Sequence, residues 1–87
     1  MDAKDRILKA IYEEFNKETF NLGNINSDTT ELEGGIFKEA ALKLEKDGYL
    51  IGVKKAIRGQ DNQVLTVWFD SDTSVTRKGA SRLTEIL

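Results

Sequence analysis

The chain has 87 residues, close to the lower size at which a domain folds without disulfides or metals, so we expect one domain over residues 1–87. It contains no cysteine, histidine or proline, which excludes a disulfide framework, a thiolate metal site and a proline-rich linker. The formal net charge is only −2 and no apolar run is long enough to span a membrane, so we expect a cytoplasmic protein without a membrane partner.

The first predicted element is an amphipathic helix that Asp2 caps and that runs to about Glu18. Five apolar residues recur at helical spacing and indicate one buried face: Ile7, Leu8, Ile11, Tyr12 and Phe15. The opposite face mixes both signs of charge, which does not favour a helix lying on a membrane surface.

The stretch of residues 19–30 has no clear periodicity. Phe20, Leu22 and Ile25 fit a short extended segment, and the polar run at 26–30 predicts a turn or a helix cap. A short second helix is compatible with this stretch, but periodicity does not place one.

A further amphipathic helix is expected over residues 35–47, or from residue 31 with a weak first turn. Thr30 and Glu33 have the spacing of a capping box. The apolar residues of this helix predict its buried stripe: Phe37, Ala40, Ala41 and Leu44. Gly48 is expected to end the helix.

Two strands are predicted over residues 49–57 and 64–69, because both are rich in β-branched and aromatic residues. The polar loop 58–63 between them is then the tip of a β-hairpin. Strict alternation turns one set of residues toward the core: Ile51, Val53, Leu65, Val67 and Phe69. The same alternation turns a second set to the other face: Val64, Thr66 and Trp68.

A polar turn follows at residues 70–74, and Thr76 is expected to cap a last helix. The apolar side of that helix is Ala80, Leu83 and Ile86 or Leu87. The predicted fold is α+β and winged-helix-like, with three helices packed on a two-stranded, or three-stranded, antiparallel hairpin. This architecture requires four residues to meet in one interior: Phe37, Leu44, Ile51 and Val67.

The helix-to-strand junction also carries a family resemblance, through Phe37, Ala40, Leu44 and the run Gly48-Tyr49-Leu50-Ile51-Gly52-Val53. With Thr76-x-Lys78-Gly79 after the hairpin, this pattern resembles the YjcQ-like proteins, a small bacterial and phage family. The later motif is also similar to the start of the last helix in MarR-like and PadR-like regulators. The resemblance implies a winged-helix-like fold and supplies no catalytic residues.

Catalytic chemistry has little support in this composition. Histidine and cysteine are the commonest general base and the strongest nucleophile, and the chain has neither. Asp70 and Asp72 are two residues apart, a spacing that suits weak binding of a hard cation, but a solvated turn is the simpler interpretation. No phosphate-binding glycine motif occurs. We therefore predict a binding module that is not an enzyme and has no cofactor or metal.

Basic residues indicate one candidate function, contact with duplex DNA. Residues 1–33 carry a net −4 and residues 34–87 a net +2. The candidate contacts lie on the 35–47 helix, the hairpin and the start of the last helix: Lys38, Lys43, Lys46, Lys54, Lys55, Arg58, Arg77 and Lys78. Glu39 and Glu45 would repel phosphate, and the helix carries no Arg, Asn or Gln to read bases.

Each basic group also has a structural interpretation. The helix face is equally explained as a solvated face with a Glu39–Lys43 pair. Lysines at 54 and 55 suit an edge strand that must not pair with another chain. Arg77 and Lys78 suit pairing with the carboxylates at 70 and 72.

A protein-interaction module is the alternative function. Its candidate anchors are Leu42, Tyr49 and Trp68, the only tryptophan. Tryptophan is enriched at the energetic centres of interfaces, but a helix that covers Trp68 is the default expectation. The mild acidity of the chain and the mixed charges of its helices favour this alternative over DNA binding.

Overall fold

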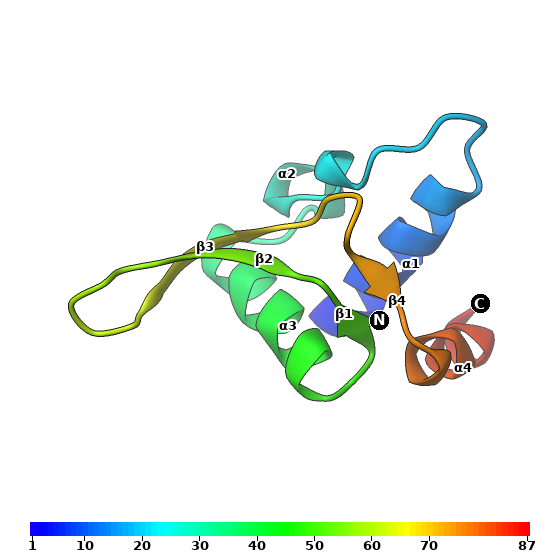
Figure 1. The fold of residues 1–87 in the computed structure, drawn as a ribbon. Helices are drawn as coiled ribbons and strands as arrows, with labels where there is room; N and C mark the ends of the chain where they lie inside the picture. The colour runs from blue at the N-terminus through cyan, green and yellow to red at the C-terminus, as the bar shows by residue number, and fades with distance from the viewer.

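The computed structural model describes residues 1–87 and confirms the α+β class (Figure 1). Its elements are α1 (Ala3–Phe15), the 3-10 helix η1 (Leu22–Asn24), α2 (Ser27–Thr30), α3 (Gly34–Lys46), β1 (Leu50–Ile51), β2 (Lys54–Ile57), β3 (Val64–Trp68), β4 (Ser74–Val75) and α4 (Arg77–Ile86). The expected three helices are therefore four. The additional helix, α2, is a single turn with η1 just before it, too short for either to produce a periodic pattern.

Helix α1 ends at Phe15 rather than near Glu18. Asp2 caps its start, as predicted, by accepting a hydrogen bond from the backbone N–H of Asp5 at 2.9 Å. Ile7, Leu8 and Ile11 are fully buried, but Tyr12 and Phe15 remain 40% and 37% exposed. The last turn of α1 leads into the loop of residues 16–21 and away from α3, so its apolar face is only partly covered there (Figure 1).

The predicted capping box at Thr30 and Glu33 is wrong. The box belongs to Asn26 and Thr29 at the start of α2, while Thr30 lies inside that turn. Glu33 is instead the N-cap of α3, because its carboxylate accepts a hydrogen bond from the N–H of Gly35 at 2.8 Å. Helix α3 therefore begins at Gly34, one residue before the predicted start.

The end of α3 follows the prediction closely. Gly48 adopts a left-handed conformation with φ of +84°, and the N–H of Tyr49 donates to the carbonyl of Leu44 at 2.8 Å. This pair of features is the Schellman stop of a helix, and it turns the chain directly into β1. The predicted stripe of α3 is buried, as expected: Phe37, Ala40, Ala41 and Leu44.

The strands form two separate two-stranded antiparallel sheets, not one continuous hairpin or a three-stranded sheet. β1 pairs with β4, and β2 pairs with β3. The two sheets are separated at Gly52, which has a φ of +74°, a value that residue types other than glycine rarely adopt. A Cβ atom there would overlap the carbonyl oxygen of Asp72. The hydroxyl of Thr73 donates to the carbonyl of Gly52 at 2.7 Å and secures the bend.

This bend explains why one predicted core residue is wrong. Strict alternation would bury Ile51, but Ile51 is 55% exposed and Leu50 is fully buried in its place. Phe37, Leu44 and Val67 do meet in the single cluster of buried side chains, so three of the four required residues share one interior.

Leu65 is the second wrong assignment, since it is 54% exposed. Leu65 has no partner on β2, because Thr66 pairs with Ala56 and Val64 pairs with Ile57. Its side chain borders the start of α3 without being covered by it. A register shift between Ala56 and Ile57 also interrupts regular pairing at this point. Val53 and Phe69 are buried as predicted.

Helix α4 closes the body against α1. Thr76 caps it, as predicted, by accepting from the N–H of Gly79 at 3.1 Å. Leu83 is buried, but Ala80 is exposed, so the apolar side of α4 is narrower than predicted. An ion pair of 2.7 Å between Arg82 and Asp5 joins α4 to α1. None of the helices has the length and apolar character needed to cross a membrane.

Candidate interaction surface

Lys54 on β2 is held by two carboxylates of its own chain. Its ammonium group lies 3.1 Å from Asp72 and 4.0 Å from Asp70. The hydrogen bond to Asp72 raises the pKa of Lys54 above its ordinary value, with further contributions from the two negative charges. The ammonium group of Lys54 therefore binds the two carboxylates that the sequence suggested as ligands of a hard cation.

The other two cations of the hairpin are also paired. Lys55 lies 2.7 Å from Glu45 of α3, which joins the hairpin to that helix. Arg58 at the tip lies 2.6 Å from Asp61 and donates to the side chain of Gln63. The Arg58–Asp61 hydrogen bond raises the pKa of Arg58 and lowers that of Asp61. The hairpin thus has little uncompensated positive charge.

The lysines of α3 have separate environments. Lys38 is half-buried and donates to the carbonyl of Val64 at 3.2 Å. Lys43 lies 3.8 Å from Asp47, so the expected Glu39–Lys43 pair does not form. Lys46 is exposed and makes no ion pair.

The first turn of α4 does not form the ion pairs that the sequence suggested. Lys78 donates to the backbone carbonyl of Asp47 at 2.7 Å and lies 4.8 Å from the ring centre of Tyr49. Arg77 is exposed and makes no ion pair. The expected pairing of these residues with Asp70 or Asp72 is therefore wrong, because Lys54 takes both carboxylates.

The eight predicted contacts therefore do not form one free cationic surface. Five have an acceptor within 3.2 Å in their own chain: Lys38, Lys54, Lys55, Arg58 and Lys78. Lys43 has the longer contact to Asp47 described above. The two for which neither kind of contact is found, Lys46 and Arg77, lie at the end of α3 and the start of α4, away from the hairpin tip.

Among the three predicted anchors, only Trp68 is close to half exposed. Leu42 and Tyr49 are partly buried and pack against the core. Trp68 is 45% exposed, so the interpretation of a covered indole is wrong. Ile57 and Leu65, which the sequence did not suggest as anchors, are 52% and 54% exposed.

Ile57 pairs with Val64, the neighbour of Leu65 in the chain, so the two exposed residues belong to the same outer segment of the hairpin. Leu65 also lines a shallow groove of about 260 Å³ between β3 and the start of α3. Phe37 and Val67 contribute to the same groove, and Lys38 borders it. The space between the helix and the hairpin is thus partly apolar.

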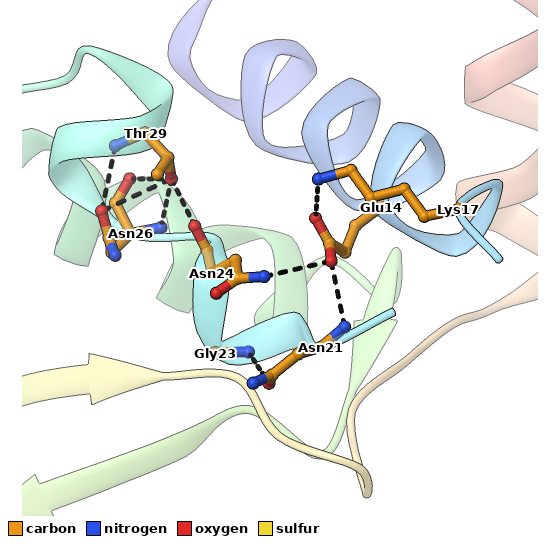
Figure 2. Close-up of polar contacts among 7 residues, drawn as sticks. All are labelled: Glu14, Lys17, Asn21, Gly23, Asn24, Asn26 and Thr29. Carbon is orange, nitrogen blue, oxygen red and sulfur yellow. Dashed lines mark hydrogen bonds and ion pairs between the residues drawn. The ribbon is translucent and has the colours of Figure 1, made fainter. Parts of the chain in front are cut away.

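A second polar cluster, at the end of α1, was missed by the sequence interpretation (Figure 2). Glu14 is only 3% exposed and accepts from the ammonium of Lys17, the backbone N–H of Asn21 and the side chain of Asn24. These donors lower its pKa, the backbone N–H of Asn21 most strongly. Glu14 lies seven residues after the buried Ile7, which is about two helical turns, so the helical period alone could have predicted that Glu14 is buried.

The Glu14 cluster fixes a loop that carries an exposed aromatic residue. Phe20 is 50% exposed, and its ring packs edge-on against Phe15 with ring centres 4.9 Å apart.

All buried polar side-chain atoms have hydrogen-bond partners, and no three acidic side chains gather to hold a metal ion. The Glu14 cluster is therefore a structural support for the loop.

Comparison of the chain with protein-family models, with curated protein sequences and with solved structures found no match.

Proposed function

We propose that the chain is a winged-helix-like protein-interaction module that binds its partner through the β2–β3 hairpin. The winged-helix description is supported by α3, its glycine stop and the antiparallel hairpin that projects beyond it (Figure 1). The YjcQ-like relationship stays a prediction from the residues that carry it.

The observation that carries the proposal is the contrast between paired charges and exposed apolar side chains on the hairpin. Lys54, Lys55 and Arg58 each contact a carboxylate, whereas Ile57 and Leu65 are about half exposed. Exposed aliphatic residues that lie together, with a polar surround, are typical of protein-contact surfaces.

The same contrast weighs against the DNA-binding alternative. Phosphate binding gains free energy when a protein cation replaces condensed counterions. A lysine already bound to a carboxylate must lose that partner first, which reduces the gain. Glu45 and Asp61 would also lie close to any phosphate that approached the hairpin. Of the eight predicted contacts, those without a carboxylate partner belong to α3 and α4 and not to the hairpin: Lys38, Lys46, Arg77 and Lys78.

The protein arm of the test is affinity capture from cells of the native host. The wild-type chain should retain a discrete partner that the double variant Ile57→Ser/Leu65→Ser does not retain. Ile51→Ser is the matched control, because Ile51 is equally exposed but lies in β1. Retention by both variants would overturn the assignment of the surface to the β2–β3 hairpin.

The nucleic-acid arm is a titration of the purified chain with duplex DNA at low salt. We expect no saturable binding. Binding that weakens with salt by the slope expected for several phosphate contacts would overturn the proposed function in favour of the DNA alternative.

A further inference from the structure

One face of the β2–β3 hairpin has no covering element. Lys54 is paired with Trp68 and Ala56 with Thr66, and cross-strand partners project from the same face of a sheet. The opposite face carries Lys55, which contacts α3, and the buried Val67. We call the first set, with the adjoining Asp70 and Asp72, the Trp68 face.

The charges of the Trp68 face do not balance. Two carboxylates share the single ammonium group of Lys54, and the side chain of Asp72 is 74% exposed. The next cation along the chain after Lys54 and Lys55 is Arg58 of the hairpin tip, and Asp61 already pairs with it. An exposed indole therefore lies beside a surface with an excess carboxylate.

We infer that the Trp68 face docks a cationic segment of a partner protein, one with an arginine or lysine side chain at the contact. This inference rests on the proposed function and names the class of partner. A guanidinium group is attracted both to the face of an indole ring and to a carboxylate. Nucleic acid and acidic segments are repelled by the same carboxylates.

The face contains its own reporter, because Trp68 is the only tryptophan. The test titrates the full chain with hexa-arginine peptide, hexaglutamate peptide and short duplex DNA while tryptophan emission is recorded. We expect a saturable change with hexa-arginine and none with the other two. No change with hexa-arginine, or an equal change with hexaglutamate, would overturn the inference while leaving the proposed function standing. A saturable change with duplex DNA would overturn both.

A pair of charge-matched variants separates local recognition from general attraction. Asp72→Asn removes the exposed carboxylate of the Trp68 face and should weaken hexa-arginine binding about two- to fivefold. Glu39→Gln makes the same change of charge at an exposed position of α3 and should leave the affinity nearly unchanged. Equal weakening by both variants would mean that peptide binding depends only on the net charge of the protein, and the inference would fail.

Discussion

The body of the protein and the β2–β3 hairpin use the same residue types in opposite ways. In the body, aliphatic side chains such as Ile7, Ile11 and Leu44 are almost completely buried. On the hairpin, Ile57 and Leu65 are about half exposed. The free energy of folding therefore resides mainly in the body, and the outer hairpin is available for contacts with other molecules.

The charged groups show the same division. Asp5 and Glu14 of the body are nearly inaccessible and connect separate elements of the fold. Arg58 and Asp61 of the hairpin are about half exposed. They belong to the same turn, so their ion pair does not connect separate elements. A charge pair of the second kind contributes little to stability, because water screens it.

The largest expected difference between the two regions comes from truncating a leucine in each. Leu44→Ala should lower the free energy of unfolding by about 2–5 kcal/mol, because it leaves a cavity in the core. Leu65→Ala should cost less than about 1 kcal/mol, since the side chain is already half in water. Urea unfolding measures both values, and equal losses would contradict the division.

Glycine substitutions test the bend that separates the regions. Gly52→Ala should cost about 2–4 kcal/mol, because alanine disfavours the positive φ and its Cβ would meet the Asp72 carbonyl. Gly59→Ala at the hairpin tip has open space around it and should change stability very little. If Gly52→Ala unfolds at the urea concentration of the wild type, the bend is not a fixed feature.

Acid should affect the body more than the hairpin. The pKa of Glu14 is lowered below its usual 4.5 in the folded chain, so its stabilisation is complete above pH 4.5 and is lost as the pH falls through the folded value. Glu14→Gln should lower the Tm at pH 7 by a few degrees. The Tm of this variant should also decrease less than the wild-type Tm as the pH falls below 4.5. Asp61→Asn should change the acid profile less, since the Asp61 pair is exposed. A larger change with Asp61→Asn would contradict this order.

The sequence was sufficient for features that depend on local spacing. The stripe of α3, its stop at Gly48 and the Thr76 cap each follow from residues within one or two helical turns. The four-residue helix α2 was not predictable, because one turn shows no period. The bend at Gly52 was also missed, since its geometry depends on a carbonyl twenty residues later in the chain.

The candidate surface was less predictable for the same physical reason. Exposure of Ile57, Leu65 and Trp68 depends on how far the helices extend along the hairpin, which strand alternation alone does not specify. Neutralisation of Lys54 and Lys55 depends on Asp72 and Glu45, which lie 18 and 10 residues away in the sequence. A count of basic residues could therefore suggest a DNA surface where the folded chain has ion pairs.

The smallest expected effect concerns the ion pair that joins the two regions. A double-mutant cycle of Lys55→Met and Glu45→Gln should give a coupling of about 0.5–1 kcal/mol, because both side chains are only 29% exposed and the pair spans hairpin and helix. The cycle of Arg58→Gln and Asp61→Asn should give a coupling too small for urea unfolding to resolve, because that pair is half in water. The reverse order would mean that the tip stabilises itself independently of the body, and the exposed apolar residues of the hairpin would then belong to a separately ordered unit.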